Sequence, residues 1–334
     1  MRDTITFDDV LLVPQYSEII SRKSIDISNK LSPNIVLDLP IIAAPMDTVT
    51  NSHIINVLNS LGATGVLHRY NTPYEQTMHI KRINGLKSAA IGVTGDYLKR
   101  AIALVEAGVE VLCVDVAHGH HALVRHALKT LRNTFGYDLH IMAGNVATLK
   151  AFNDLSDWGA DSIRVGIGGG SICSTRIQTG HGVPTLQSVI DCSVSDRPAK
   201  LIADGGIKSS GDMVKALAAG ADFVMAGSLL AGSLESPGEI IHIKDVAYKK
   251  YRGMASVEAQ IDWRGHSASI EGVSHMVPYK GGVKKILNEL EAGIRSGFSY
   301  TGALNIVEFQ SKSRLIKQSS AGLYESRTHI KDRF

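Results

Sequence analysis

Cysteine is scarce in this sequence, which has three among 334 residues: Cys113, Cys173 and Cys192. They form no CxxC pair and no even set, which argues against a disulfide framework and indicates a reducing compartment. The first residues contain no apolar signal core, and no apolar run approaches the length of a membrane span. We therefore expect a cytoplasmic protein with no membrane partner.

A strong excess of charge is also missing, because the formal net charge is +3 and Lys and Arg form no dense run. This balance gives no reason to expect a nucleic acid partner, and a few basic groups in an anion-binding cleft would account for it. The remaining composition is ordinary for a globular protein, with 44% hydrophobic and 20% charged residues. A chain of 334 residues fits one α/β barrel of about 250 residues with extensions.

Eight short apolar runs recur along the chain with helix-like patterns between them. The runs span 39–46, 63–68, 88–93, 109–116, 139–146, 161–167, 200–206 and 221–227. Most alternate little, as parallel strands covered on both faces do. Helical spacing at 97–107 and 210–219 ends each time just before a glycine. The pattern predicts a TIM (β/α)8 barrel. A doubly wound sheet fits less well, because no GxGxxG follows the first strand.

The prediction for domain organisation is a single domain over residues 1–334 with no inserted second domain. It assigns 1–38 to an entry segment that caps the barrel, 39–250 to the barrel strands, 251–282 to an active-site flap and 283–334 to a C-terminal helix and tail. Residues 257–275 are polar with weak periodicity, so we expect a long loop that acts as a lid. The polar, basic tail from Ser311 is expected to be disordered or ordered by a neighbouring subunit.

Polar residues and glycines follow six of the eight predicted strands. They are Met46-Asp47-Thr48, Asp115 to His120, Gly144-Asn145, the loop from Gly168, Asp204-Gly205-Gly206 and Gly227-Ser228. Barrel enzymes place catalytic residues at these carboxyl ends, and the loops after strands seven and eight commonly bind phosphate. The coincidence predicts an enzyme.

The loop after the sixth strand carries the most distinctive chemistry. Gly168, Gly169 and Gly170 allow close backbone approach to a ligand, and Cys173 follows among small hydroxyl residues. A phosphate could be held by backbone N–H groups while the cysteine attacks a neighbouring group. A glycine turn beside an inert buried cysteine is the alternative for the loop taken alone.

The chain resembles the inosine monophosphate dehydrogenase and guanosine monophosphate reductase superfamily over nearly its whole length. The motifs that carry the resemblance are Ala44 to Thr50, Gly144-Asn145-Val146, Gly166 to Thr175, Asp204 to Ile207, Gly227-Ser228, Tyr251 to Ser256, Glu271-Gly272 and Val277 to Gly281. The resemblance implies covalent attack of a cysteine on a purine C2, with hydride moving between C2 and a nicotinamide.

The resemblance also implies a role for individual residues. Cys173 would be the nucleophile, Thr175 would lie beside the leaving or entering group, and Glu271 would exchange protons with it. The substrate contacts would come from Met46, Ser171, Asp204, Gly206, Gly227, Ser228, Tyr251, Gly253 and Met254. The side facing nicotinamide would be formed by Asp115, Asn145, Arg164 and Gly166. For Arg164 a salt-bridged strand end, and for Asn145 a turn residue, remain alternatives. His118 and His120 are expected to be polar lining, and we expect no metal enzyme.

The sequence departs from the dehydrogenase pattern in three places. The family's water-activating Arg-Tyr pair is absent from the flap, which reads Asp262-Trp263-Arg264-Gly265. Only 16 residues separate Met254 from Glu271, which is short for a dehydrogenase flap. The paired regulatory insert, a tandem of small adenosine-binding modules, is missing after the second strand. These departures favour the reductase, which converts GMP to IMP and ammonia with NADPH.

Other segments look more like the dehydrogenase, which oxidises IMP to XMP with NAD. They are Ala44 to Thr50, Tyr251 to Met254 and Ser320 to Ser326. In that enzyme the tail helps to hold K+ together with carbonyls of a neighbour's cysteine loop, which here would be those of Gly168, Gly170 and Cys173. The resemblance implies a homotetramer. A nucleotide-binding barrel without turnover is a third hypothesis, and Cys173, Thr175 and Glu271 argue against it.

Overall fold

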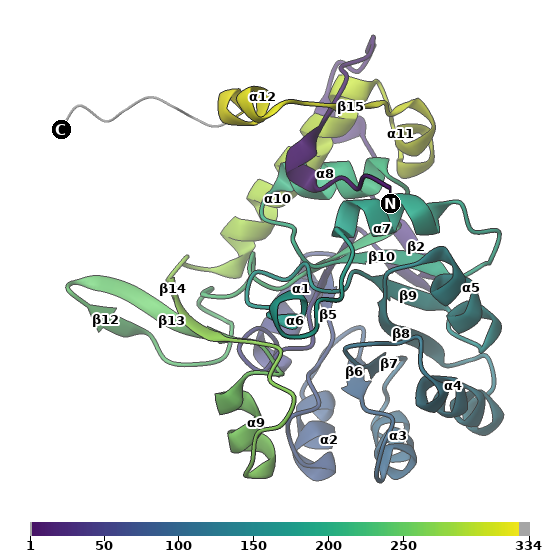
Figure 1. The fold of residues 1–334 in the computed structure, drawn as a ribbon, viewed down its shortest axis with the longest axis vertical. Helices are drawn as coiled ribbons and strands as arrows, with labels where there is room; N and C mark the ends of the chain where they lie inside the picture. The colour runs from purple at the N-terminus through teal and green to yellow at the C-terminus, as the bar shows by residue number, and fades with distance from the viewer. Residues whose placement is uncertain (1, 327–334) are drawn as a thin grey trace.

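The computed structural model describes residues 2–326 and contains a closed barrel of eight parallel strands (Figure 1). The strands are β4 (Ile41–Ala43), β5 (Thr64–Gly65), β6 (Ser88–Ile91), β7 (Val111–Asp115), β8 (His140–Val146), β9 (Ser162–Val165), β10 (Lys200–Asp204) and β11 (Phe223–Ala226). Hydrogen bonds join each to the next in the order β5-β4-β11-β10-β9-β8-β7-β6. A parallel bridge between Leu67 and Ala89 closes the ring between β5 and β6. The predicted TIM barrel, with eight strands in the expected places, is confirmed.

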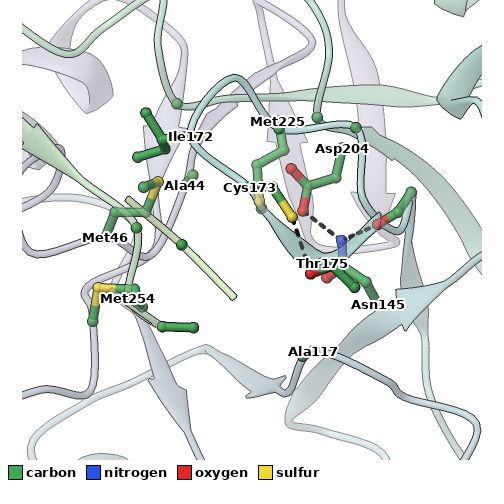
Figure 2. Close-up of a pocket in the computed structure, with 18 of the residues that line it drawn as sticks. Ala44, Met46, Ala117, Asn145, Ile172, Cys173, Thr175, Asp204, Met225 and Met254 are labelled. Carbon is green, nitrogen blue, oxygen red and sulfur yellow. Dashed lines mark hydrogen bonds between the residues drawn. The ribbon is translucent and has the colours of Figure 1, made fainter. Parts of the chain in front are cut away.

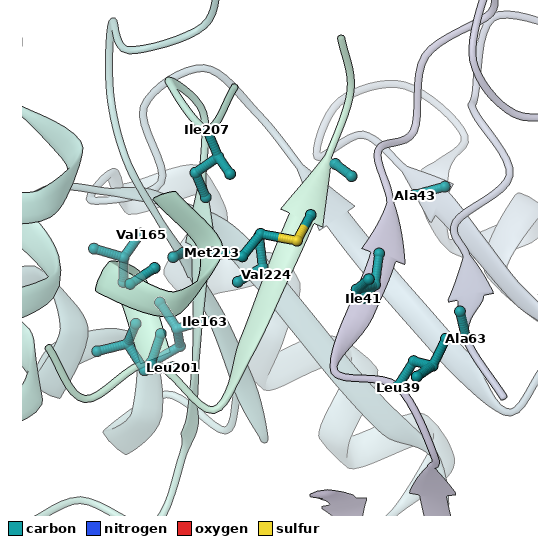
Figure 3. Close-up of a cluster of buried hydrophobic side chains, with 14 of the residues drawn as sticks. Leu39, Ile41, Ala43, Ala63, Ile163, Val165, Leu201, Ile207, Met213 and Val224 are labelled. Atoms are coloured by element: carbon teal, nitrogen blue, oxygen red, sulfur yellow. The ribbon is translucent and has the colours of Figure 1, made fainter. Parts of the chain in front are cut away.

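Strand side chains divide between two apolar layers, because successive residues of a strand point to opposite faces. One layer fills the barrel interior and includes Ile42, Val66, Ala90, Cys113, Met142, Ile202, Phe223 and Met225. The other packs outward against the helices and includes Ile41, Ala43, Ile163, Val165, Leu201 and Val224 (Figure 3). Most residues of these strands are apolar and buried on both faces, and polar ones such as Asp115 and Asp204 lie mainly at strand ends, which is why the sequences show little alternation.

Helices connect the strands around the outside of the barrel. They are α1 (Ser52–Ser60), α2 (Pro73–Lys81), α3 (Tyr97–Glu106), α4 (Ala122–Phe135), α5 (Leu149–Asp157), α6 (Thr175–Thr179), α7 (Thr185–Ser193) and α8 (Ser210–Ala218). Their N-termini are often capped by side chains, as in α2, where Thr72 and Glu75 form a capping box. Gly108 and Gly220 follow α3 and α8 with positive φ, as their positions in the sequence predict. The chain passes from β5 through α2 to β6 with no inserted module.

The entry segment and the tail meet on one side of the barrel. The entry segment holds η1 (Phe7–Asp9), β1 (Val10–Leu12), η2 (Arg22–Ser24) and the hairpin β2 (Asn29–Ser32) and β3 (Ile35–Leu37). The tail follows α10 (Val283–Thr301) and α11 (Ile306–Lys312), and it forms β15 (Leu315–Lys317) and α12 (Ser320–Glu325). β15 pairs antiparallel with β1. The expectation of a disordered tail is therefore wrong up to residue 326, because the chain's own N-terminal strand holds β15. Ordering of the tail by a neighbouring subunit stays a prediction.

The expected lid loop is also wrong in part, because the flap region contains regular structure. β12 (Ile241–Ile243), β13 (Val246–Arg252) and β14 (Ser274–Pro278) form a three-stranded antiparallel sheet that extends away from the barrel (Figure 1). The boundary predicted at residue 250 falls inside β13. Between β13 and β14 lies α9 (Val257–Arg264), capped by Ser256. Its apolar periodicity is weak because few of its side chains are buried.

No helix within residues 2–326 is both long enough and apolar enough to span a membrane.

Candidate active site

One cavity of about 300 Å³ opens at the carboxyl ends of the barrel strands (Figure 2). Every site residue predicted from the sequence lines it. These residues are Met46, Asp115, Asn145, Arg164, Gly166, Gly168, Gly170, Ser171, Cys173, Thr175, Asp204, Gly206, Gly227, Ser228, Tyr251, Gly253, Met254 and Glu271. They come from six strand ends and from the flap. The structure therefore brings the predicted set together, while the role of each residue stays a prediction.

Glycines shape the cysteine loop because other residues would collide with its surroundings. Gly166 has a φ of +146°, and a Cβ there would lie 1.9 Å from the carbonyl oxygen of Asp204. A Cβ at Gly169 would lie 2.3 Å from Thr185 Oγ1. The loop can therefore pass close to β10 only with hydrogen side chains at these positions. Cys173 is presented from this loop and is half-buried.

A hydrogen-bonded chain joins Cys173 to the flap. The Sγ atom of Cys173 lies 3.1 Å from Thr175 Oγ1, which donates to Glu271 Oε2 at 2.8 Å. Backbone contacts fix this arrangement, since Cys173 pairs with Gly272 and the Ser174 N–H donates to the Glu271 carbonyl at 2.8 Å. A nucleophile, a hydroxyl relay and a carboxylate thus stand in one line, an arrangement suited to moving a proton at the reacting centre.

Asp204 is held by an internal network at the end of β10. Its Oδ2 accepts from Asn145 Nδ2 at 2.8 Å and from Arg164 Nε and Nη2 at 3.0 and 2.9 Å. Arg164 also donates to Asp115 Oδ1 at 2.5 Å. Burial by itself would lower the pKa of Arg164, but the carboxylates of Asp204 and Asp115 raise it well above its ordinary value. Arg164 is thus the salt-bridged strand-end residue that the sequence allows as an alternative to a nicotinamide contact. It positions the carboxylates of Asp204 and Asp115.

Another part of the cavity wall is formed by the loops after β10 and β11. Gly205 and Gly206 have φ values of +93° and +75°, which turn the backbone toward the cavity. A Cβ at Gly227 would lie 3.1 Å from the hydroxyl of Tyr251. Burial raises the pKa of Tyr251 to about 12, although a hydrogen bond with Ser171 opposes this shift. The phenol therefore stays neutral and can donate a hydrogen bond to an anion in the cavity.

The flap is fastened to the barrel by one ion-pair network. Arg252 donates to Asp47 Oδ2 through Nε at 2.9 Å and to Asp262 Oδ2 of α9 at 2.5 Å. The Asp47 N–H lies 3.3 Å from the sulfur of Met254, which places this methionine at the cavity wall.

Sequence reasoning missed two residues of the cavity wall, Arg69 and Tyr70. Both follow β5, so the rule that site residues follow barrel strands could have found them. Arg69 lies 3.6 Å from Asp115, and its buried Nε has no hydrogen-bond partner among the described residues. The ring of Trp263 on α9 stacks on Tyr70 at 5.6 Å. Arg69 thus adds a guanidinium to the cavity wall beside Asp115.

Metal binding by acidic, histidine or cysteine side chains has no support within residues 2–326, where no group of three or more could hold an ion. His120 instead lies 2.7 Å from Asp154 Oδ2 and stacks on Trp158. In the cysteine loop the Gly170 carbonyl accepts the Cys173 N–H at 3.1 Å.

The chain is similar in sequence to known proteins over almost its full length. A family model described as IMP dehydrogenase / GMP reductase domain matches residues 4–329. The chain is 33% identical to inosine-5'-monophosphate dehydrogenase of Nitrosopumilus maritimus, with 98% of each chain covered. It is 36% identical to the same enzyme of Cryptosporidium parvum, covering 97% of this chain and 94% of the relative. It is 31% identical to GMP reductase of Leishmania major, covering 97% and 96%.

A solved structure is also similar over almost the full length. It is a cysteine-to-alanine variant of GMP reductase from Trypanosoma brucei in complex with guanosine 5'-monophosphate. The TM-score is 0.94 at 29% sequence identity, and 98% of each chain is covered. Relatives of both names thus resemble the chain to a similar degree.

Proposed function

The chain belongs to the IMP dehydrogenase / GMP reductase domain family, and from this premise we propose that it reduces guanosine monophosphate to inosine monophosphate and ammonia with NADPH. Membership makes it a purine nucleotide oxidoreductase that uses a nicotinamide cofactor. The observation that carries the finer proposal is the Cys173–Thr175–Glu271 chain, closed by a flap that holds Trp263 where an Arg-Tyr pair would be needed for hydrolysis.

Cys173 is the proposed nucleophile. Its sulfur bonds to purine C2, and the bond between C2 and the amino nitrogen breaks, so that the thiol proton and the amino group leave together as ammonia. The product is a thioimidate between C2 and Sγ. The bound cofactor supplies a hydride to C2. The C2–Sγ bond then breaks as the double bond between C2 and the ring nitrogen re-forms, which leaves inosine monophosphate and a thiolate that takes up one proton.

Thr175 and Glu271 carry the proton in the first step. The Thr175 hydroxyl lies between Sγ and the Glu271 carboxylate, so a proton from the thiol can pass to Glu271 and return to the leaving nitrogen. Because Glu271 is carried by the flap, this step requires the flap to be ordered over the cysteine loop. Residues 255–270 of the flap contain no Arg-Tyr pair to activate water, which disfavours hydrolysis of the adduct.

The nucleotide would lie with its phosphate on the wall formed by the loops after β10 and β11. Gly206, Gly227 and Ser228 offer backbone N–H groups there, and Ser171 and Tyr251 offer hydroxyls. Among the described residues no donor contacts Asp204 Oδ1, so this oxygen is available to the ribose hydroxyls while Oδ2 is held by Asn145 and Arg164. The base would then lie between Cys173 and the side chains of Met46 and Met254, with Gly253 at its edge.

The residues at the ends of β5, β7, β8 and β9 fit a nicotinamide cofactor. The Arg69 side chain, paired with Asp115 through Nε at 3.6 Å, places a guanidinium in this part of the cavity wall, and its positive charge would attract the phosphates of the cofactor. Asp115, Asn145, Arg164 and Gly166 line the same side. We propose that these residues hold the nicotinamide end against C2 and exclude water from it.

Two further properties are proposed from the resemblance. The carbonyls of Gly168, Gly170 and Cys173 would contribute to a K+ site, because carbonyl rings can replace the water around this ion. Three carbonyls leave room for ligands from a second subunit, in agreement with a homotetramer. Size-exclusion chromatography with light scattering, and activity in K+ compared with Na+, test these two points.

The second candidate is an IMP dehydrogenase without regulatory modules. The identities of 33% and 36% to named dehydrogenases favour it. Absorbance at the nicotinamide band decides between the two. We expect NADPH consumption that depends on guanosine monophosphate. NADH formation from inosine monophosphate and NAD, with no reaction in the other assay, would refute the reductase. A barrel without turnover would show neither reaction, and Cys173→Ala would leave its nucleotide affinity unchanged.

A further inference from the structure

The turn after β11, residues 227–236, lines the proposed phosphate wall at its beginning, yet it contains no regular helix or strand. Its first residues are joined by short-range bonds, in which the N–H groups of Leu230 and Ala231 donate to the Gly227 carbonyl at 3.1 and 2.9 Å. The carbonyls of Ser228 and Leu229 gain no partner from this turn. Something outside the turn must fix its orientation.

Two lysines supply that support, one within the antiparallel flap sheet and one just after its last strand. Lys249 of β13 is buried, and its ammonium donates to the carbonyls of Ser233, Leu234 and Ser236 at 3.0, 3.3 and 2.5 Å. These three bonds use all three ammonium donors. Burial lowers the pKa of Lys249. The lysine therefore holds the far end of the turn.

Lys280 lies two residues after the end of β14 and holds the beginning of the turn. Its ammonium donates to the Ser228 carbonyl at 2.5 Å and to the Leu229 carbonyl at 3.2 Å. Its backbone N–H donates to the Gly232 carbonyl at 2.9 Å, so main chain and side chain grip the same turn. The Lys280 residue is exposed as a whole, and partial loss of solvent around its ammonium lowers its pKa.

The charge of Lys280 does not reach the cavity directly. Ser228 lines the cavity and Lys280 does not, so the lysine contacts the turn from behind. The two carbonyls belong to the peptide groups that follow directly on Gly227 and Ser228, the two residues of the turn that line the cavity, and a cation bound to them holds and polarises that part of the turn. Because these carbonyls are held from behind, the orientation of the adjoining Gly227 and Ser228 backbone toward the cavity depends on Lys280.

We propose that Lys280 is a positioning residue, which orients the turn after β11 so that its N–H groups bind the phosphate of the nucleotide. The proposal rests on the proposed phosphate wall. The flap then has a second function besides carrying Glu271. Lys280, which follows its last strand β14, supports the turn at the phosphate end of the site. Nucleotide affinity then depends on a side chain that does not touch the nucleotide.

The test compares binding of guanosine 5'-monophosphate and of guanosine by isothermal titration calorimetry, without cofactor and without turnover. Lys280→Met is expected to weaken nucleotide binding about tenfold, as for the loss of one or two charge-assisted hydrogen bonds. Binding of guanosine should stay within twofold of the unsubstituted protein, because the nucleoside has no phosphate. Lys280→Arg should restore most of the affinity.

Lys284→Met is the matched control, since Lys284 is exposed and lies four residues further along the chain on α10. It removes the same charge without touching the turn, so its nucleotide affinity should be unchanged. In turnover, Lys280→Met should raise KM for the nucleotide and leave kcat within twofold.

Three results would count against the proposal. An unchanged nucleotide affinity in Lys280→Met would overturn it, and so would an equal loss for nucleotide and nucleoside, which indicates general disruption of the site. An equal loss in Lys284→Met would assign the effect to net charge. If the unsubstituted protein binds guanosine as tightly as its monophosphate, the phosphate wall itself is wrong, whatever the variants do.

Discussion

Replacement of Glu271 by glutamine tests the proton relay most sharply. Glutamine has nearly the same shape and can still hydrogen-bond Thr175 Oγ1, which now lies 2.8 Å from the carboxylate. It cannot take up a proton. General acid–base groups contribute about 10²–10⁴-fold to rates, so we expect kcat for NADPH oxidation with guanosine monophosphate to fall about 10³-fold. At 1.36 kcal/mol per factor of ten this is about 4 kcal/mol in the barrier. KM for the nucleotide should change little, because Glu271 is remote from the phosphate wall.

The assay has a covalent readout as well as a rate. Intact-protein mass spectrometry after quenching should show the Cys173 adduct forming slowly in Glu271→Gln, since ammonia departure is the step that loses its proton carrier. Glu258→Gln is the control, because Glu258 is an exposed carboxylate of the same flap that contacts Ser274. A decrease below tenfold for Glu271→Gln, or an equal decrease for Glu258→Gln, would refute the assignment.

Three other substitutions test separate parts of the account. Gly166→Ala should lower stability by about 3 kcal/mol or more and abolish activity, because its Cβ would overlap the Asp204 carbonyl. Urea unfolding measures this, and Gly211→Ala on α8, where nothing lies closer than 3.5 Å, should be nearly neutral. Burial lowers the pKa of His140 to about 4, so the unfolded chain binds its proton first and stability falls as pH drops from about 6.5 toward 4. His140→Gln should flatten that decline in urea midpoints, and an unchanged slope would contradict it. Trp263→Ala removes the stack on Tyr70, worth about 1 kcal/mol. Hydrogen exchange in residues 257–264 should then rise several-fold, and unchanged exchange would show that Arg252 alone holds α9.

Local sequence signals predicted the barrel and most of the cavity. Each strand is buried on both faces, so its apolar run is legible, and the residues after strand ends converge because parallel strands share one edge. Cys173 and Asp204 were found in this way. Glu271 was found only through resemblance, because it lies 96 residues from Thr175 and no local pattern joins the two.

Features that have no clear local sequence signal were missed. The hairpin of β12 and β13 turns at Lys244 and Asp245, which adopt positive φ without the usual Asn-Gly signal. The tail strand forms only because β1, some 300 residues earlier, offers an edge. Arg69 escaped notice because the loop after β5 contains no glycine and reads as the start of the next helix.

The fate of the amino nitrogen tests the central claim most directly. The protein is supplied with guanosine monophosphate labelled with 15N at the 2-amino group, together with NADPH, and ammonium and nucleotide products are followed by mass spectrometry. The account predicts one labelled ammonium for each NADPH oxidised and unlabelled inosine monophosphate as the product. Retention of the label in guanosine monophosphate, together with NAD-dependent conversion of inosine monophosphate to a product carrying oxygen from 18O-water, would contradict it.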